Sequence, residues 1–323
     1  MSGLRILLSA PYMIPIWDRF APLLEAAGVE VIVATVRERL EESELLAYAG
    51  QIDGALCGDD RFSAGVLEAA APRLKVISKW GTGIDSIDRQ AAARLGVRVY
   101  NTPDAFTDAV ADSVLGYILA FARQIVPGDR AMKAGAWRKL PGRALHECAL
   151  GVVGVGRIGR AVLRRAQAFG MRLLGNDIVT IPEEVTEALG VRMLSLPALL
   201  AEADFVSLNC DLNPTSHHLI DRAALARLRP QAVLINTARG PIVEEPALVE
   251  ALQTGRLAGA ALDVFEDEPL PLDSPLRSMD NVLLAPHNSN SSPAAWERVH
   301  RNTLRNLLGG LGLPIPEALA PGP

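Results

Sequence analysis

Two successive series of short apolar runs, separated by amphipathic stretches, extend along nearly the whole chain. Continuous apolar runs between helical patterns are typical of parallel strands that helices cover on both faces. The first series predicts strands at Arg5–Leu8, Glu30–Ala34, Asp53–Cys57, Lys75–Ser78 and Val97–Tyr100. The second series predicts strands at Ala149–Val153, Arg172–Gly175, Phe205–Leu208, Val233–Asn236, Ala258–Asp263 and Val282–Leu284. Two such series indicate an α/β fold with two doubly wound parallel-sheet domains.

Helical patterns lie between these strands, and several end at a glycine that suits a left-handed helix C-cap, such as Gly28 and Gly96. Helices are predicted at Trp17–Ala27, Ala64–Ala71 and Asp88–Leu95, as one long helix at Ala109–Val126, at Ala131–Ala136 and at Ala294–Leu311. No predicted strand follows the last helix, so we expect it to pack back on the first domain. Residues 1–102 and 288–323 are therefore expected to form one discontinuous domain, and residues 103–287 the other.

The bulk composition disfavours several classes of function. The 323-residue chain has a net charge of −5 and no basic run, which disfavours binding to nucleic acid through its phosphates. Its three cysteines form no CxxC pair or Cys/His cluster, so neither a metal site nor a disulfide framework is expected. The apolar stretches are too short for a secretory signal or a membrane span. We therefore expect a soluble, cytoplasmic protein.

A glycine-rich turn, Gly154-Val-Gly156-Arg-Ile-Gly159, follows a predicted strand and opens a helix. The first glycine allows the tight turn, the second lets the backbone approach a pyrophosphate, and the third lets helix and strand pack closely. The N–H groups at the helix start face the anion, and Arg157 adds a positive charge. Asp177 ends the next strand, where a carboxylate binds ribose hydroxyls and repels a 2′-phosphate, so NAD is expected rather than NADP. A turn without a ligand is the alternative.

A second glycine pair, in Gly81-Thr82-Gly83, follows a predicted strand of the first domain. No third glycine completes a dinucleotide motif at this position. Backbone N–H groups exposed at such a turn can form a nest for an anion, which suits a substrate carboxylate. A simple turn is the alternative interpretation.

Three residues that can carry chemistry each follow a predicted strand of the second domain: Arg239, Glu268 and His287. Ligands of open parallel sheets bind at the carboxyl ends of the strands. Arginine can hold a carboxylate through two hydrogen bonds, and histidine can exchange a proton near neutral pH. A carboxylate beside His287 would fix its tautomer and favour its protonated form. Next to a dinucleotide, these groups suit hydride transfer between a nicotinamide and a 2-hydroxy acid.

The other four of the five histidines are weaker candidates for this chemistry. His146 and His300 are expected to be structural. The pair His217-His218 lies in a polar loop and is expected to be solvated. His287 is therefore the candidate acid/base.

In combination, six motifs resemble those of the D-isomer-specific 2-hydroxyacid dehydrogenases, and in particular of their phosphoglycerate dehydrogenase branch. The motifs are Lys79-Trp-Gly-Thr-Gly-Ile-Asp85, Asn101-Thr-Pro103, Gly154-Val-Gly-Arg-Ile-Gly159, Asn236-Thr-Ala-Arg-Gly240, Leu262-Asp-Val-Phe-Glu-Asp-Glu-Pro269 and Ala285-Pro-His287. The resemblance covers about residues 50 to 310 and implies a Rossmann NAD-binding domain inserted in a discontinuous, flavodoxin-like substrate domain. It also implies an NAD-dependent oxidoreductase that acts on CH–OH groups, and a homodimer formed through the long helix after Pro103.

The resemblance implies roles for residues at the matching positions. His287 would be the acid/base, Glu268 would orient it, and Arg239 would bind the substrate carboxylate and carbonyl. Further substrate contacts are implied for Trp80, Gly81, Thr82 and Gly83. NAD contacts are implied for Thr82, Gly154, Gly156, Arg157, Ile158, Gly159, Asp177, Cys210, Thr237, Ala238, Arg239 and Asp263. Among these, Asp263 would meet the nicotinamide carboxamide.

The chain departs from the family's pattern at two places. Asn209 stands where the family commonly has a histidine, which changes the cofactor edge without abolishing binding. Where phosphoglycerate dehydrogenases place an arginine against the substrate phosphate, this chain has Cys57-Gly58-Asp59-Asp60, and Arg61 comes later. Asp59 and Asp60 would repel a phosphate, so a substrate other than 3-phosphoglycerate is favoured.

The predicted function is NAD-dependent interconversion of a small D-2-hydroxy acid and its 2-keto acid. One alternative keeps this chemistry on a phosphorylated or phosphonate-bearing acid, including 3-phosphoglycerate, with Lys79 or Arg61 supplying charge. A second alternative is a non-catalytic, NADH-sensing scaffold similar to transcriptional corepressors. The complete set of Arg239, Glu268 and His287 argues against the scaffold.

Overall fold

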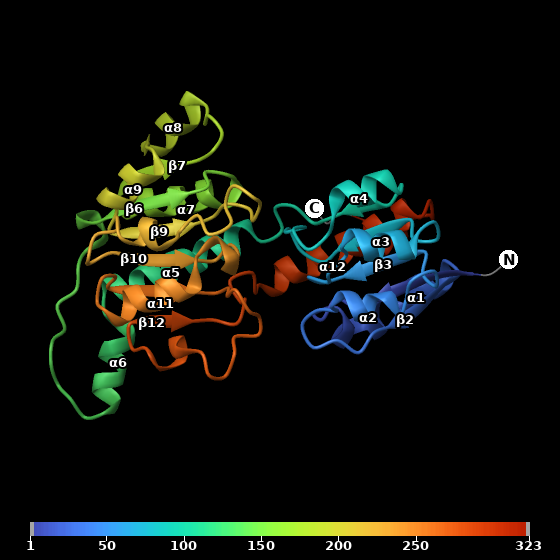
Figure 1. The fold of residues 1–323 in the computed structure, drawn as a ribbon, viewed down its shortest axis with the longest axis horizontal. Helices are drawn as coiled ribbons and strands as arrows, with labels where there is room; N and C mark the ends of the chain where they lie inside the picture. The colour runs from blue at the N-terminus through green and yellow to red at the C-terminus, as the bar shows by residue number, and fades with distance from the viewer. Residues whose placement is uncertain (1–2, 321–323) are drawn as a thin grey trace. The chain divides into compact units, whose positions relative to one another are not determined.

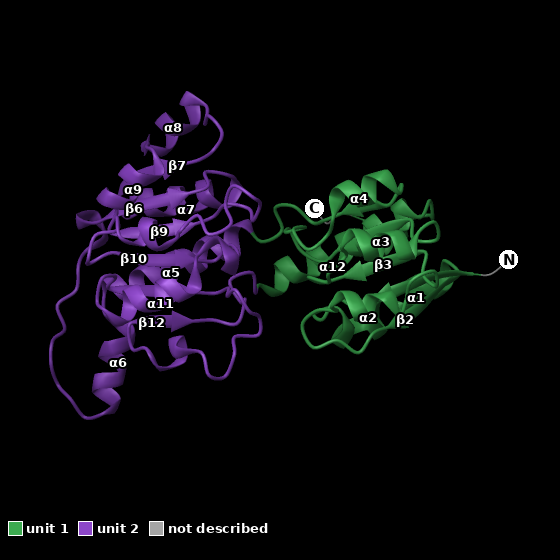
Figure 2. Ribbon diagram, viewed as in Figure 1, with its two compact units in different colours: residues 1–106, 292–323 green, residues 107–291 purple. Residues whose placement is uncertain are grey.

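The structure, a computed structural model, describes residues 3–320. The chain divides into two compact units, which Figure 2 shows in different colours. Unit 1 comprises Met1–Phe106 and Ser292–Pro323, and unit 2 comprises Thr107–Ser291. Each unit has its own parallel sheet with helices packed around it (Figure 1). The predicted α/β class with two doubly wound sheets is therefore confirmed.

The sheet of unit 1 has five parallel strands in the order β2-β1-β3-β4-β5. The strands span Leu4–Leu8 (β1), Val29–Val33 (β2), Gly54–Cys57 (β3), Val76–Lys79 (β4) and Arg98–Tyr100 (β5). Every residue of β3 and β4 is buried, as expected for strands covered on both faces. The order is that of a flavodoxin-like sheet, and all strands predicted for this unit are confirmed.

The last helix of the described chain returns to unit 1, as predicted. Helical segments of this unit are η1 (Ile14–Arg19), α1 (Ala21–Ala26), α2 (Glu42–Leu46), α3 (Ala64–Ala70), α4 (Arg89–Arg94), α12 (Pro293–Gly310) and η5 (Glu317–Leu319). Helix α12 packs on β3, β4 and β5. The Ser78 hydroxyl donates a hydrogen bond to the Thr303 carbonyl oxygen at 2.8 Å. Gly28 and Gly96 have φ values of 70° and 72°, which confirms them as left-handed residues after helices.

The sheet of unit 2 has seven parallel strands in the order β12-β11-β10-β9-β6-β7-β8. The strands span Ala149–Val153 (β6), Arg172–Asn176 (β7), Val191–Met193 (β8), Phe205–Leu208 (β9), Val233–Asn236 (β10), Gly259–Leu262 (β11) and Val282–Leu284 (β12). The strand order reverses beside β6, and such a switch point is where Rossmann sheets bind dinucleotides. The sequence pattern does not predict β8, because it is a short edge strand in which only Val191 is buried.

Helices pack around the sheet of unit 2 as well. They are α5 (Thr107–Ala122), α6 (Ile125–Lys133), η2 (Leu145–Glu147), α7 (Arg157–Ala168), α8 (Glu183–Leu189), α9 (Leu196–Glu202), α10 (Arg222–Leu225), η3 (Gly240–Ile242), α11 (Glu245–Gln253) and η4 (Pro275–Ser278). Helices α5 and α7 pack against each other. Val114, Ile118 and Val162 are fully buried in the core that these two helices share with the sheet.

The prediction of a single helix over Ala109–Val126 is wrong. The chain forms α5 and α6 with a bend of 58°, and Gln124 between them is left-handed with φ of 53°. Pro127 supplies the reason, because inside one continuous helix its ring would clash with the carbonyl one turn back. In the first turn of a new helix its missing N–H costs no hydrogen bond. Helix α6 therefore starts at Ile125. Of the separate helix expected at Ala131–Ala136, only residues 131–133 are helical, as the end of α6.

The helix expected over Trp17–Ala27 is also interrupted. Segments η1 and α1 meet at Phe20, whose N–H donates to the Trp17 carbonyl oxygen at 2.8 Å. Pro22 lies at the start of α1, where its missing N–H is tolerated. In a continuous helix the same proline would break the hydrogen-bond pattern, so the chain restarts.

No single helix among residues 3–320 is both long and apolar enough to cross a bilayer. The bent pair α5–α6, taken together, is long and apolar enough by length and composition alone. The apolar side chains of α5, such as Val114 and Ile118, are buried in the core of unit 2.

His300 on α12 is buried in unit 1, as expected for a structural histidine. Its ring Nδ1 accepts a hydrogen bond from the Trp80 indole N–H at 2.9 Å. Burial lowers the pKa of His300 to about 4, with Glu297 opposing the shift and Arg19 adding to it. The imidazole is therefore a neutral acceptor in the folded protein near neutral pH.

We expect this histidine to make folding stability depend on pH between about 6.5 and 4. In this window the unfolded chain binds a proton that the folded chain excludes, so the free energy of unfolding falls as the pH falls. After allowance for solvent screening, the expected loss is about 2 kcal/mol. Urea unfolding at several pH values measures how the free energy of unfolding depends on pH. This dependence should be weaker in His300→Gln, where the amide oxygen can still accept from Trp80. The same pH dependence in both proteins would contradict the assignment of the lowered pKa to His300.

Candidate active site

The glycine-rich turn between β6 and α7 has the geometry that its glycines predict. Gly154 has a φ of 91°, and a Cβ there would lie 2.6 Å from the Cys210 nitrogen. A Cβ on Gly159 would lie 2.0 Å from the Gly154 carbonyl oxygen, so helix and turn are in close contact. A Cβ on Gly156 would meet nothing within 4 Å. The turn therefore leaves open space at the N-terminus of α7, where anions bind.

Asp177 follows β7 and holds the same turn. Its Oδ2 accepts a hydrogen bond from the Val155 N–H at 2.7 Å, and its Oδ1 accepts one from the Val179 N–H at 3.1 Å. A carboxylate oxygen has two lone pairs, so each can accept a further bond from a hydroxyl. The structure thus places Asp177 beside the turn, and its contact with a ribose stays a prediction.

The loops after β9 and β10 offer two buried acceptors. Asn209 Oδ1 and Thr237 Oγ1 have no hydrogen-bond partner among the described residues. Buried polar atoms are rarely left unpaired, so this edge of the sheet suits a polar ligand such as a dinucleotide. Burial raises the pKa of the Cys210 thiol to about 11, which makes it a neutral neighbour of the turn. The residues present therefore fit a bound dinucleotide.

His287 lies in the loop after β12, and Asp263 at the end of β11 holds this loop. The Asp263 carbonyl oxygen accepts from the His287 N–H at 2.8 Å. Its carboxylate accepts from the N–H groups of Asn288 at 2.7 Å and Ser289 at 2.9 Å. His287 has a φ of 50°, a strained conformation for a residue with a side chain. The buried Asp263 therefore maintains that conformation, and its contact with the nicotinamide stays a prediction.

Glu268 lies in the loop after β11 and pairs with His287. Its Oε1 accepts from the Phe265 N–H at 3.0 Å, and its Oε2 lies 3.1 Å from His287 Nδ1. The two side chains are 21% and 23% exposed, so both are sheltered yet reachable. A carboxylate at Nδ1 holds the proton there and leaves Nε2 to exchange a proton with a ligand.

Arg239 lies at the end of the loop after β10. The Asn236 side chain shapes this loop, because its Nδ2 donates to the Arg239 carbonyl oxygen at 2.8 Å. A Cβ on Gly240 would lie 1.8 Å from the Phe265 carbonyl oxygen. The loops that carry Arg239 and Glu268 are therefore in direct backbone contact. Strands β10, β11 and β12 are neighbours, so unit 2 brings Arg239, Glu268 and His287 to one edge of its sheet.

The second glycine pair follows β4 in unit 1. The Gly81 carbonyl oxygen accepts from the N–H of Thr102 at 2.8 Å and from its hydroxyl at 2.9 Å. Asn101 Nδ2 donates to the Thr82 carbonyl oxygen at 2.6 Å. The Asn101-Thr102 motif therefore fixes this turn. Trp80, just before the turn, is held by its bond to His300, and the substrate contacts of residues 80–83 stay a prediction.

Known proteins resemble this chain in sequence and in fold. Residues 115–289, more than half of the chain, match the family model described as D-isomer specific 2-hydroxyacid dehydrogenase, NAD binding domain. A glyoxylate reductase from Thermofilum pendens is 41% identical over 283 residues, which cover 85% of this chain and 83% of that relative. The chain belongs to the D-isomer specific 2-hydroxyacid dehydrogenases. The resemblance inferred from the sequence motifs is thereby confirmed.

A solved structure extends the similarity of this dehydrogenase to both units. D-lactate dehydrogenase from Aquifex aeolicus, complexed with NAD and lactic acid, has a TM-score of 0.84 and 27% identity, with 95% of each chain covered. The family and these relatives make the protein an oxidoreductase that acts on the CH–OH group of 2-hydroxy acids. NAD is its cofactor, as the sequence predicts.

A phosphoglycerate-oxidising relative is also similar to this dehydrogenase. D-3-phosphoglycerate dehydrogenase from Methanocaldococcus jannaschii is 40% identical over 285 residues, which cover 87% of this chain and 53% of that relative. From the sequence, the residues expected to influence binding of a substrate phosphate are Lys79, Asp59, Asp60 and Arg61.

Two of these residues form an ion pair in unit 1, and a third is buried. Lys79 Nζ lies 2.8 Å from Asp59 Oδ1, and the Lys79 side chain is 3% exposed. Asp60 is fully buried and accepts hydrogen bonds from the Leu40 N–H and the Ser9 hydroxyl. Burial raises the pKa of the Asp60 carboxyl. The expected repulsion of a phosphate by Asp60 is therefore wrong, because this side chain faces the interior of unit 1.

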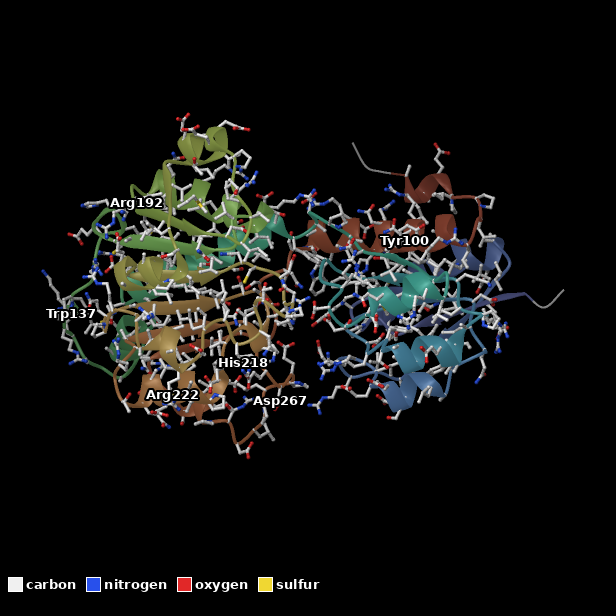
Figure 3. All side chains as sticks on the ribbon, turned by 45° about the horizontal axis from the view of Figure 1, so that its top comes forward. Tyr100, Trp137, Arg192, His218, Arg222 and Asp267 are labelled. Atoms are coloured by element: carbon white, nitrogen blue, oxygen red, sulfur yellow. The ribbon has the colours of Figure 1, made fainter. Side chains whose placement is uncertain are left out.

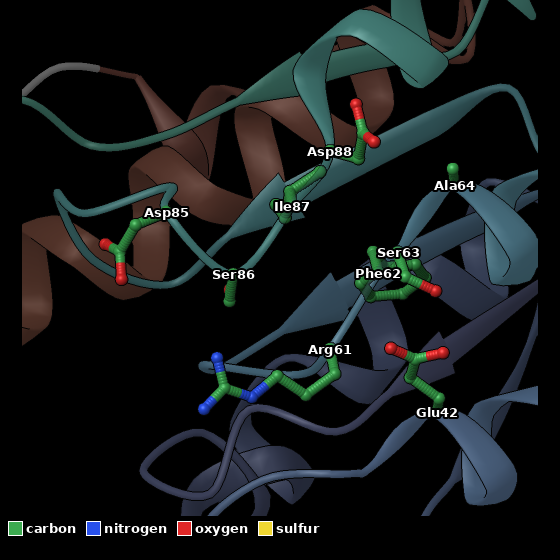
Figure 4. A pocket seen from close by; sticks show the side chains of 9 residues that line it. All are labelled: Glu42, Arg61, Phe62, Ser63, Ala64, Asp85, Ser86, Ile87 and Asp88. Carbon is green, nitrogen blue, oxygen red and sulfur yellow. The ribbon is translucent and has the colours of Figure 1, made fainter. Parts of the chain in front are cut away.

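Arg61 lines an open pocket of about 340 Å³ in unit 1. Its side chain extends away from the Glu42 carboxylate, toward the side of Ser86 (Figure 4). Asp85 and Asp88 also line the pocket, so carboxylates outnumber the guanidinium group there. This excess of negative charge makes the pocket a poor site for a dianionic phosphate.

The sequence interpretation of His217 and His218 needs correction. His217 is exposed as expected. His218 Nε2 lies 2.7 Å from Glu266 Oε1, and the two side chains are 40% and 27% exposed. The signal that could have found this pair is the position of Glu266, two residues before Glu268 in the same acidic motif. His218 is thus a fixed neighbour of the predicted catalytic loop.

Proposed function

We propose that this dehydrogenase interconverts a small D-2-hydroxy acid and its 2-keto acid, with Arg239, Glu268 and His287 as catalytic residues. The observation that carries the proposal is the Glu268–His287 pair, whose Oε2 and Nδ1 are 3.1 Å apart. The pair follows two adjacent strands of the NAD-binding unit, at the sheet edge where ligands of parallel sheets bind.

His287 moves the proton in this mechanism. During reduction its Nε2–H donates a proton to the carbonyl oxygen of the keto acid, and during oxidation Nε2 takes the proton back. Glu268 accepts from Nδ1 in both directions, so it holds the ring and stabilises its charged form. Arg239 binds the carboxylate through its planar guanidinium and polarises the adjacent carbonyl. Hydride transfer is the chemistry that NAD supplies when bound.

NAD would be held by the glycine-rich turn, by Asp177 and by the loops after β9 and β10. The open space beside Gly156 suits the pyrophosphate. Asn209 Oδ1 and Thr237 Oγ1 suit polar groups further along the cofactor. Thr82, Arg157, Ile158, Cys210, Ala238 and Asp263 are the further contacts that the family resemblance implies.

Asp177→Asn is expected to weaken NADH binding and to reduce the preference for NADH over NADPH. The amide lacks the negative charge that repels a 2′-phosphate, and its NH₂ group cannot accept from a backbone N–H. We expect the ratio of the two Kd values to fall about tenfold, as for removal of one like-charge contact. Fluorescence titration with NADH and with NADPH measures the two Kd values. Asp273→Asn, at an exposed position of unit 2, is the control, and an equal ratio in both variants would contradict the assignment.

The substrate that we propose is small and unphosphorylated. Lys79 is engaged by Asp59, and acidic side chains surround Arg61, so neither cation is well placed for a phosphate. A glyoxylate reductase among the relatives is consistent with a small acid. Melting temperatures with NADH present should rise with glycolate, D-lactate or D-glycerate and not with 3-phosphoglycerate, because NADH does not react with these acids and a bound ligand stabilises by mass action. A rise with the phosphorylated acid alone would contradict this substrate class.

We further propose that the enzyme is a cytoplasmic homodimer. Large apolar side chains are exposed on α6 and the loop after it: Ile125 at 54%, Met132 at 52% and Trp137 at 89%. Figure 3 labels Trp137, which lies in the loop after α6. A second copy of the chain would cover such side chains. Light scattering of the full chain should give twice the monomer mass, and Trp137→Ser should lower it.

A further inference from the structure

His218 contacts both loops of unit 2 that carry Arg239 and Glu268. Its backbone N–H donates to the Pro241 carbonyl oxygen at 2.8 Å. Its ring Nε2 lies 2.7 Å from Glu266 Oε1. The residue has a φ of 49°, a conformation that only well-fixed surroundings maintain outside glycine. His218 therefore connects the two loops, once through its main chain and once through its ring.

The two loops also touch each other directly. A Cβ on Gly240 would lie 1.8 Å from the Phe265 carbonyl oxygen and 2.5 Å from the Glu266 nitrogen. Glu245, at the start of α11, exchanges two hydrogen bonds with Glu266. The Glu245 N–H donates to Glu266 Oε1 at 3.3 Å, and the Glu266 N–H donates to Glu245 Oε2 at 3.2 Å. A displacement of Glu266 is therefore transmitted to both loops.

The contact of Glu266 with Glu245 places two acidic side chains together. Burial raises the pKa of Glu245, and the charges of Glu266 and Asp267 add to the shift. The His218 ring meets the same Glu266 Oε1 that accepts from the Glu245 N–H, and because a carboxylate oxygen accepts, Nε2 is the donor. Figure 3 labels His218 and Asp267 on this part of unit 2. The His218 ring thus helps to hold the Glu266 carboxylate in its position.

We propose that His218 is a positioning residue of this dehydrogenase, which fixes the Glu268 loop against the Arg239 loop through Glu266 and Pro241. The inference rests on the proposed roles of Arg239, Glu268 and His287. Glu268 is anchored at the Phe265 N–H, in the same short loop as Glu266. When that loop shifts, the Glu268–His287 pair loses its alignment, and small misplacements of reacting groups reduce kcat strongly.

Steady-state kinetics of full-length variants test the proposal. His218→Ala removes the ring, and His218→Gln keeps an N–H donor at similar reach from the main chain. His217→Ala is the matched control, with kcat expected within about twofold of the unaltered enzyme. The exposed His217 ring lies tilted beside that of His218, with centroids 4.0 Å apart, and no contact of His217 with Glu266 is seen among the described residues. We expect kcat for keto acid reduction to fall about tenfold in His218→Ala, and to recover to within about threefold of the unaltered enzyme in His218→Gln. The KM for NADH should be unchanged in all variants.

A double-mutant cycle separates positioning from a general loss of stability. If His218 acts through Glu266, the effects of His218→Ala and Glu266→Gln on kcat should not multiply. The proposal is overturned if His218→Ala retains kcat within about twofold, if His218→Gln recovers nothing, or if the two effects multiply. Turnover by His287→Ala is a separate readout of the proposed function, so failure of the His218 proposal leaves that function standing.

Discussion

Replacement of His287 by alanine is expected to lower kcat for keto acid reduction by about 10²–10⁴ while NADH binding is retained. The imidazole is the proton donor in the proposed mechanism, and Glu268 Oε2 at 3.1 Å from Nδ1 keeps its tautomer fixed. Alanine removes the donor but leaves the loop intact, because Asp263 holds it through main-chain N–H groups. Steady-state kinetics and an NADH titration of the same preparation measure both effects.

His146→Ala is the control for this experiment. His146 is an exposed histidine in η2, and no role in the site is proposed for it. The kcat of His146→Ala should stay within about twofold of that of the unaltered enzyme, as for a surface substitution away from the site. If His287→Ala also kept kcat within about tenfold with the best substrate, another group would have to supply the proton.

Gly240→Ala is expected to reduce both stability and activity. The new Cβ would lie 1.8 Å from the Phe265 carbonyl oxygen, a distance at which backbone atoms must move. The loops of Arg239 and Glu268 would separate, so we expect a destabilisation of about 3 kcal/mol. For the same reason kcat/KM should fall about 100-fold. Urea unfolding and steady-state kinetics measure the two losses.

Gly309→Ala is the matched control for the glycine substitution. A Cβ there would lie 3.7 Å from Ile315 Cδ1, an ordinary contact, and the position is exposed on α12. Alanine favours a helix over glycine, so stability should change by less than about 1 kcal/mol. If Gly240→Ala were as stable and active as Gly309→Ala, the close contact between the Arg239 and Glu268 loops would be refuted.

Most of the fold follows from the sequence because buried parallel strands are continuous apolar runs. The runs at Ala149–Val153 and Phe205–Leu208 match β6 and β9 residue for residue. The pattern fails where a local restriction outweighs hydrophobicity, as at Pro127, which ends the apparent long helix early. It also fails at edges, since β8 buries too little surface to leave a periodic signal.

The candidate site is less predictable, because its parts meet through contacts between distant segments. Arg239, Glu268 and His287 could be chosen as residues after strands, and the sheet brings their loops to one edge. The backbone role of Asp263 and the bond of His218 to Glu266 join residues far apart in sequence, with no local pattern. The burial of Asp60 has no local signal for the same reason, since its partners Ser9 and Leu40 come from other segments.

Incubation of the full chain with NADH and pyruvate or glyoxylate tests the proposed reaction through its product. We expect NADH to be oxidised in equal amount to the hydroxy acid formed, and pyruvate to give the D-isomer of lactate. We also expect His287→Ala to form this product at least about 100-fold more slowly. Formation of the L-isomer, or an equal rate in the variant, would refute the proposed reaction and the role of His287.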